Sequence, residues 1–423
     1  MSLQPVLIAG LWRAAQSTGT FHAENPATDK TLPAEFPISS WADCEAALQV
    51  ATEAASALRQ LAPEQIAKFL MRFAERIEAR KTEIVETAHA ETALPKAPRL
   101  GDVELPRTTN QLRQAAAAAL EGSWALPTID AKLNIRSALA PIGPVLVFGP
   151  NNFPFAYNGV AGGDFASAIA AGNPVIAKAH PCHPATTKLL AEEALAALGE
   201  TGLPLATVQM IYNLAPEDGL RLVADKRLGA VGFTGSRAAG LKLKAAADAV
   251  GKPIYLELSS LNPVVILPGA LAERGEKIVE EFTGSCLMAN GQFCTSPGLT
   301  ILLAGDGAEK FITSVKAKLE STTPGTLLSA GVAKNLASSV QTLQAAGAEL
   351  VAGGSAQTGN RFANTLLRVS GEAFLASPEK LQTEAFGNAS LAVVAKDAAQ
   401  AAEIVEHLEG NLTGCIYSET RGA

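Results

Sequence analysis

The sequence is poor in aromatic residues, in charged residues and in cysteine. Across 423 residues, aromatic side chains make up 5% and charged side chains 18%, whereas hydrophobic residues reach 48%. This balance excludes a disordered chain and favours a globular protein with large buried sheets. At the ~150 residues typical of one domain, the length predicts two or three domains.

No part of the chain carries an excess of one charge. Lys and Arg number 34 against 41 Asp and Glu, which gives a net charge of −7, and no basic block occurs. Nucleic acids and anionic membranes are recognised by clustered positive charge, so neither is expected as a partner. We expect small molecules or further copies of the chain instead.

Long hydrophobic runs and paired cysteines are also missing. The most apolar stretch, residues 138–150, is interrupted by four prolines and glycines and is shorter than the ~20 residues of a membrane helix. No basic leader precedes the first apolar run, so no signal peptide is expected. The five cysteines form no CxxC pair and the histidines no metal-binding pattern. We therefore expect reduced thiols, a cytoplasmic protein and no metal site.

The hydrophobic pattern changes along the chain. Helical spacing dominates residues 40–81, with Ser40 as a cap and Pro63 opening a second helix, and it returns over 103–120. From residue 145 to 258, short β runs alternate with helical segments, and a second such series starts at 262. This alternation predicts an α/β protein with doubly wound parallel sheets and a domain boundary near Ser259.

Two segments carry groups that could react. Cys294 lies in GQFCTSPG, in a predicted loop, where a thiol can act as a nucleophile, although a free cysteine is more often inert core. Cys286, on an apolar helix face, is predicted to be of the inert kind. Glu257 ends the strand in YLELSS. A carboxylate there is either a general base facing a ligand crevice or a solvated side chain.

Two strand-to-helix turns could bind negative charge. In FGPNNFPF, Asn152 either caps the next helix or stabilises an oxyanion. In GFTGS, Gly235 and Ser236 stand where a helix begins. Small residues at that point admit a phosphate to the helix N-terminus, or they serve packing alone.

In chain order, the four segments are FGPNNFPF, GFTGS, YLELSS and GQFCTSPG, and together they resemble motifs of the aldehyde dehydrogenase superfamily. Two further segments, VIAKAHP with Lys178 and TEAFGN with Glu384, also resemble this family, and the likeness covers residues 20–418. The sequence is most similar to the branch that contains 2,5-dioxovalerate (α-ketoglutarate semialdehyde) dehydrogenases and a related NADP-dependent fatty aldehyde dehydrogenase. The resemblance implies two doubly wound parallel-sheet domains and a β-arm for oligomerisation. Residues 1–127 and 145–258 would form the dinucleotide-binding domain, 128–144 the oligomerisation hairpin, and 259–423 the catalytic domain.

The resemblance also implies a reaction: NAD(P)-dependent oxidation of an aldehyde, 2,5-dioxopentanoate to 2-oxoglutarate, through a thiohemiacetal and a thioester on Cys294. Asn152 would hold the oxyanion and Glu257 would activate water. The implied cofactor contacts are Lys178, Gly235, Ser236, Glu384, Phe386 and Pro150. Lys178, His180 and Arg221 are candidates to supply positive charge to a cofactor 2′-phosphate, although His180 could equally cap a loop. The candidate substrate contacts are Phe153, Arg107 and Arg113; the two arginines could bind a carboxylated aldehyde, although solvated arginines on a helix are more common.

The sequence departs from the family pattern in two ways that bear on function. In NAD-preferring members of the family, a Glu lies three residues after the lysine that binds the cofactor ribose. That lysine corresponds to Lys178 in this sequence, and the position of the Glu is taken by Pro181. NADP is therefore the expected cofactor, with NAD as the alternative. The family usually continues beyond the position of Ala423, so we expect a truncated catalytic domain that lacks its C-terminal part.

Two questions stay open at this level. A homodimer or homotetramer is expected if the C-terminal arm is present. The alternatives to the semialdehyde substrate are oxidation of medium- and long-chain fatty aldehydes, or a catalytically impaired homologue that acts as a scaffold.

Overall fold

The computed structural model describes residues 3–422. The chain divides into two compact units. Unit 1 comprises residues up to Asn25 together with Lys30–Leu258, and unit 2 comprises Pro26–Asp29 and the residues from Ser259 onward. Met1, Ser2 and Ala423 fall inside the predicted domain limits but lie outside the described residues.

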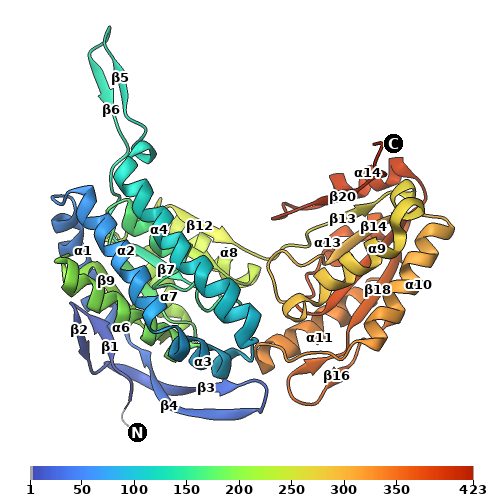
Figure 1. Cartoon of the computed structure of the whole chain (residues 1–423), viewed down its shortest axis with the longest axis horizontal. Coiled ribbons are helices and arrows are strands. Elements are labelled where there is room, and N and C mark those ends of the chain that lie inside the picture. Colours follow the sequence, from blue (N-terminus) through green and yellow to red (C-terminus); the bar gives the residue numbers. More distant parts are fainter. Residues whose placement is uncertain (1–2, 423) are drawn as a thin grey trace. The chain divides into compact units, whose positions relative to one another are not determined.

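Unit 1 is built on a seven-stranded sheet in the order β12-β11-β7-β8-β9-β1-β2 (Figure 1). Its strands are β1 (Val6–Ile8), β2 (Leu11–Arg13), β7 (Val145–Phe148), β8 (Val175–Lys178), β9 (Val208–Ile211), β11 (Ala230–Thr234) and β12 (Ile254–Glu257). The five strands from β12 to β9 are parallel. Strand β7 is buried along its whole length, as its uninterrupted VLVF sequence predicts.

The helices of unit 1 connect these strands in two directions. They are α1 (Trp41–Leu58), α2 (Pro63–Ala79), α3 (Lys81–Thr92), α4 (Leu105–Glu121), α5 (Gly163–Ala170), α6 (Pro184–Thr201), α7 (Pro216–Ala224) and α8 (Arg237–Asp248), with a π-helical segment η1 (Lys96–Glu104) before α4. From β7 the chain runs through β8 to β9 on one side, and then to β11 and β12 on the other. Right-handed crossovers therefore place α5 and α6 on one face and α7 and α8 on the opposite face.

The predicted helix starts near residues 40 and 63 are confirmed. Ser40 is the N-cap of α1, and its hydroxyl accepts from Ala42 N at 3.2 Å. Pro63 is the first residue of α2. The helix predicted from Ala156 instead begins at Gly163, because residues 149–162 form a tight loop. A Cβ at Gly149 would lie 2.6 Å from the carbonyl oxygen of Tyr157.

Residues before the first helix form strands that the sequence pattern does not indicate. Strands β3 (Ser17–Asn25), β4 (Lys30–Ser39) and β10 (Asn213–Leu214) make a three-stranded sheet. In β3 the more buried positions alternate with exposed ones from Thr18 to Asn25, but Phe21 is the only large apolar side chain among them. In β4 the alternation breaks down from Glu35 onward. The period-2 signal of a strand is therefore weak in this part of the sequence.

A β-hairpin extends from unit 1 after α4 (Figure 1). It pairs β5 (Thr128–Asp130) with β6 (Ile135–Ser137), inside the region predicted as an arm. Every residue of both strands is exposed. Apolar side chains at the hairpin and its base are exposed as well, among them Leu126, Ile129, Leu133 and Ile135.

Unit 2 contains a six-stranded sheet in the order β15-β18-β19-β14-β13-β20. Its strands are β13 (Val264–Ile266), β14 (Leu299–Leu303), β15 (Glu349–Ala352), β18 (Thr365–Ser370), β19 (Ala389–Ala395) and β20 (Cys415–Tyr417), and β16 (Ala356–Gln357) pairs with β17 (Arg361–Phe362) outside it. Its helices are α9 (Pro268–Leu287), α10 (Asp306–Ser321), α11 (Ala330–Ala345), α12 (Gly371–Ala376), α13 (Pro378–Leu381) and α14 (Ala398–Glu406). All sheet pairs are parallel except that of β15 with β18.

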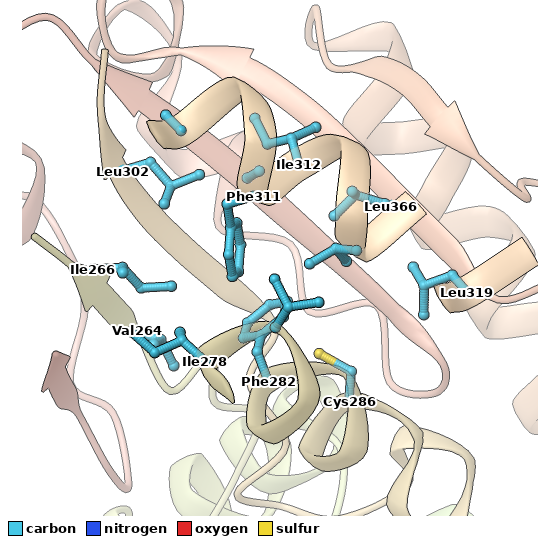
Figure 2. Packing of buried hydrophobic residues seen from close by; sticks show 14 of the residues in the cluster. Val264, Ile266, Ile278, Phe282, Cys286, Leu302, Phe311, Ile312, Leu319 and Leu366 are labelled. Atoms are coloured by element: carbon cyan, nitrogen blue, oxygen red, sulfur yellow. The ribbon is translucent and has the colours of Figure 1, made fainter. Parts of the chain in front are cut away.

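The core of unit 2 lies between its sheet and the helices α9 and α10 (Figure 2). The rings of Phe282 and Phe311 meet edge to face, with centroids 5.5 Å apart. Cys286 is part of this core, and burial raises the pKa of its thiol to about 12. The prediction that Cys286 belongs to the core is therefore confirmed.

No helix within residues 3–422 is long and apolar enough to cross a membrane. The same range contains no group of three His, Cys, Asp or Glu side chains placed to hold a metal ion.

The buried carboxyl of Glu91 predicts a pH-dependent stability. It accepts from Ala185 N and from Thr186 N at the start of α6, both at 2.8 Å. Burial outweighs these bonds and raises the pKa of Glu91 from 4.5 to about 7. The folded pKa exceeds the unfolded one, so this group stabilises the fold below the unfolded value. That contribution, about 3 kcal/mol, is lost as the pH rises through the folded value.

Glu91→Gln is therefore expected to flatten the change in unfolding free energy between pH 5 and pH 8, measured by urea denaturation. The control is Glu53→Gln, which alters an exposed carboxyl on α1. An unchanged pH profile in the Glu91 variant would contradict the assignment.

Candidate active site

Four of the predicted site positions lie along one edge of the unit 1 sheet. Register pairs Phe148 with Phe233 and Lys178, and Thr234 with Glu257. The carboxyl ends of β12, β11, β7 and β8 are therefore adjacent. Strand connections diverge between β7 and β11, which is the position where ligands bind in doubly wound sheets. The loop after β7 carries Asn152, and the turn after β11 carries Gly235.

The loop after β7 is held by several tertiary contacts. Asn152 is 5% exposed, and its carbonyl oxygen accepts from the Arg99 guanidinium at 2.9 Å. The Pro150 carbonyl lies 2.8 Å from His183 Nε2. These contacts fix the loop backbone on both sides of its two adjacent asparagines.

Next to this loop, the end of β8 presents one cation and two neutral imidazoles. Burial lowers the pKa of Lys178 to about 8. Burial, and then electrostatic interactions with Lys178 and with His183, lower the pKa of His180. His180 Nδ1 accepts from Cys182 N at 3.1 Å, so this imidazole supports the loop and is neutral. It can donate a hydrogen bond to a phosphate but adds no positive charge.

The turn after β11 joins Glu257 to the start of α8. Gly235 N donates to the Glu257 carbonyl at 3.0 Å. Ser236 is the N-cap of α8, and its hydroxyl accepts from Ala239 N. The sequence analysis missed Asp164, whose pKa is raised by removal of water from its carboxyl and then by the charge of Glu257. Two carboxylates thus interact at this edge.

The predicted arginines have different surroundings. Arg107 donates to the Tyr157 hydroxyl at 2.8 Å, and its guanidinium lies 5.6 Å from the Phe153 ring centroid. Arg113 forms a bidentate ion pair with Glu78, with bonds of 2.7 and 2.8 Å. Of these two arginines, Arg107 is therefore next to the Asn152 loop, whereas the charge of Arg113 is already paired. Arg221 stacks on Trp41, 3.7 Å from the ring centroid.

In unit 2, Cys294 lies in the loop between α9 and β14. Its carbonyl accepts from Asn262 Nδ2 at 2.9 Å, and the same amide donates to Ser296 O at 2.8 Å. Cys294 is half-buried, in contrast to Cys286. One side chain therefore fixes the backbone at Cys294 and two residues beyond it.

The segment with Glu384 and Phe386 packs against the same loop. Gly291 has φ +67°, and a Cβ there would lie 2.0 Å from the Gly387 carbonyl oxygen. Burial raises the pKa of Glu384, while hydrogen bonds from the Ser259 side chain and the Ser260 backbone lower it. The structure thus brings the cysteine loop and the Glu384 segment together inside unit 2.

Sequence reasoning also missed Arg99 and Glu104, which hold the Asn152 loop. Both lie in the irregular η1 segment before α4. No local spacing links them to residue 152, so the contact is visible only in the folded chain.

A lysine, a carboxylate, an amide-bearing loop and a glycine turn at the carboxyl ends of parallel strands define a class: α/β enzymes that bind a nucleotide cofactor at a sheet edge. The particular family follows from comparison of the sequence. Residues 12–423 match the aldehyde dehydrogenase family model, and the chain belongs to this family.

Curated relatives narrow the comparison. The chain is 38% identical to alpha-ketoglutaric semialdehyde dehydrogenase 2 of Azospirillum brasilense, over 99% of this chain and 82% of the relative. It is 32% identical to alpha-ketoglutaric semialdehyde dehydrogenase of Acinetobacter baylyi, over 96% of this chain and 79% of the relative.

Solved structures confirm the fold, an aldehyde-dehydrogenase-like pair of α/β units. Aldehyde dehydrogenase from Bartonella henselae superposes with a TM-score of 0.86 at 21% identity, covering 100% of this chain and 88% of that one. An aldehyde dehydrogenase C mutant from Pseudomonas syringae, in complex with NAD+ and octanal, gives 0.85 at 22% identity, covering 99% and 85%.

Proposed function

We propose that this protein oxidises an aldehyde that carries a distal carboxylate, with α-ketoglutarate semialdehyde giving 2-oxoglutarate, and uses NADP or NAD. The observation that carries the proposal is the alignment of Asn152, Lys178, Gly235 and Glu257 along one sheet edge. The two semialdehyde dehydrogenases similar to this chain support the substrate class.

The proposed reaction begins at Cys294. Its thiolate attacks the aldehyde carbon, and the negative charge that develops on the carbonyl oxygen is held by the Asn152 side-chain amide and the Cys294 backbone N–H. A bound nicotinamide supplies the acceptor for the hydride that leaves this carbon. Glu257 then removes a proton from water, which attacks the thioester carbon and releases the acid together with the Cys294 thiolate.

The residues at the sheet edge fit a dinucleotide. The α8 N-terminus, with Gly235 and Ser236, offers backbone N–H groups to a pyrophosphate. Lys178 would hold the ribose hydroxyls, and Pro181 leaves no carboxylate to repel a 2′-phosphate. Since His180 is neutral, we assign the positive charge for that phosphate to Lys178 and Arg221. Glu384 and Phe386 are proposed for the nicotinamide ribose and ring, and Pro150 for the cofactor-binding loop.

Arg107 is proposed to recognise the distal carboxylate. Within residues 3–422 no carboxylate pairs with it, and the Tyr157 hydroxyl and Phe153 ring orient its guanidinium. We expect Arg107→Met to raise KM for α-ketoglutarate semialdehyde about tenfold or more, because a hydrogen bond to a charged group is lost. KM for an uncharged aldehyde of similar length should change little.

The comparison variant is Arg113→Met, on the same helix, where a smaller change is expected because Glu78 already occupies the guanidinium. Equal effects of Arg107→Met on charged and uncharged aldehydes would remove Arg107 from the substrate site.

The experiment that tests the whole proposal is a matrix of turnover measurements. Short semialdehydes and long-chain aldehydes are each combined with NADP and with NAD. The proposal expects the highest kcat/KM for the carboxylated semialdehyde. A preference for long-chain aldehydes would favour a fatty aldehyde dehydrogenase, and no turnover in any combination would favour a scaffold.

We also propose that the protein is cytoplasmic and that it forms a homodimer or homotetramer. All five cysteines are free, which suits a reducing cytoplasm. The exposed apolar side chains of the β5–β6 hairpin suit burial against another copy of the chain. Light scattering of the purified protein, expected to show a homodimer or homotetramer, tests the second point.

A further inference from the structure

A buried ion pair lies beneath the loop that carries Asn152. Arg99 Nη1 and Glu104 Oε2 are 2.5 Å apart, and the two side chains are 10% and 0% exposed. Buried charges of this kind persist when each is paired and hydrogen-bonded. Both partners come from η1, whereas the groups that they hold come from the loop after β7.

Each partner binds a different part of this loop. Glu104 Oε1 accepts from Phe155 N at 2.8 Å and from Ala156 N at 3.0 Å. Arg99 Nη2 donates to the Asn152 carbonyl at 2.9 Å, and its guanidinium lies 4.5 Å from the centroid of the Phe153 ring. Four of the five positions from 152 to 156, all except Pro154, are thus held by one ion pair.

We propose that Arg99 and Glu104 are positioning residues for the oxyanion amide: the pair fixes the backbone at residue 152 so that the Asn152 side chain stays oriented toward the reacting carbonyl oxygen. This inference rests on the proposed function, because it assumes that role for Asn152. It adds two residues that touch neither substrate nor cofactor.

The physical reason is the lack of other regular structure in this loop. Residues 149–162 contain neither helix nor strand, so neither an α-helical nor a β-sheet hydrogen-bond ladder fixes the backbone at residue 152. An oxyanion donor stabilises a transition state only if it is already in place. Charge-assisted bonds from buried groups are short and strong enough to supply that rigidity.

Arg99 also links the amide to the neighbouring ring. Its planar fork bonds Glu104 through one nitrogen and the Asn152 carbonyl through another, while its face covers Phe153. A lysine at this position would carry the positive charge, but it has neither the paired N–H donors nor the planar face of a guanidinium. The effect of the positive charge can therefore be separated from that of the guanidinium geometry by replacing Arg99 with lysine.

The test is a double-mutant cycle between Arg99 and Asn152. Arg99→Met is expected to lower kcat by about 10- to 100-fold, as a small misplacement of a catalytic group does, with KM for aldehyde and cofactor within about threefold. In an Asn152→Ala background, the same substitution should lower kcat by less than about threefold, because the group through which it acts is gone.

A second readout avoids the cofactor altogether. An activated ester such as p-nitrophenyl acetate acylates a thiol through the same kind of oxyanion. The rate at which the full chain is acylated at Cys294, followed by release of nitrophenolate, should fall in Arg99→Met and in Asn152→Ala to a similar extent. Arg99→Lys should fall between wild type and Arg99→Met, and it keeps the buried charge paired if the methionine variant fails to fold.

The matched control is Arg80→Met, which breaks a partly buried set of ion pairs to Glu83, Glu192 and Glu193 elsewhere in unit 1. It should leave the acylation rate unchanged. The positioning role would be overturned if Arg99→Met lowered kcat by the same factor in the wild-type and Asn152→Ala backgrounds. It would also be overturned if Arg99→Met raised KM by the same factor by which it lowered kcat. Acylation that persists in Cys294→Ala would instead refute the proposed function, so the two failures are distinguishable.

Discussion

Replacing Cys294 by alanine is expected to reduce aldehyde oxidation by roughly 10⁴-fold or more while leaving the protein folded. In the proposed reaction, the Cys294 thiol forms the covalent bond to the aldehyde carbon, and alanine has no nucleophile to replace it. The side chain is small and half-buried, and Asn262 holds the loop backbone through the Cys294 carbonyl. Turnover with either nicotinamide cofactor measures the loss of aldehyde oxidation, and circular dichroism measures whether the variant is folded.

Two other cysteines provide the controls. Cys415→Ala, in the exposed strand β20, should leave turnover unchanged. Iodoacetamide should modify Cys294 rapidly and Cys286 slowly, because burial raises the pKa of Cys286 to about 12 and keeps its thiol protonated. Aldehyde should protect Cys294. Comparable rates at the two positions, or retained turnover in Cys294→Ala, would exclude this sulfur as the nucleophile.

The parts of the fold that follow from the sequence are those with a strong hydrophobic period. Strand β7 is a buried apolar run, and α1 begins at a side-chain cap, so both were predictable from local rules. Strands β3 and β4 were not, because β3 has a single large apolar side chain, Phe21, and the burial of β4 alternates irregularly. The start of α5 was misplaced because backbone packing at Gly149 keeps the preceding segment in a loop.

The candidate site divides in the same way. Glu257 and Lys178 end strands and Asn152 follows one, so their places at the sheet edge could be predicted from the order of elements alone. Their electrostatic surroundings could not. The neutral state of His180 depends on burial and on two neighbouring groups, and the bonds from Arg99 to the loop join positions far apart in sequence.

Replacing Glu257 by glutamine is expected to separate the two halves of the reaction. The amide cannot take a proton from water, so hydrolysis of the thioester should slow by about 10²- to 10⁴-fold. Formation of the thioester should slow much less if the base acts mainly on water. The first turnover would then appear as a burst of reduced cofactor equal to the enzyme concentration, followed by a slow steady state.

Rapid mixing with absorbance detection measures this burst, and mass spectrometry of the quenched protein should find the acyl group on Cys294. Tyr255→Phe is the matched control, because this residue lies on the same strand with its side chain 67% exposed; its turnover should match wild type. A variant that shows no burst and a slow first turnover would place Glu257 before the hydride step, where it deprotonates the thiol. An Arg99→Met variant is expected to show no burst and to accumulate no acyl-enzyme, because poor stabilisation of the oxyanion slows formation of the thioester. A burst in the Glu257 variant and its absence in the Arg99 variant would therefore assign Glu257 to the second half of the reaction and the Asn152 loop to the first.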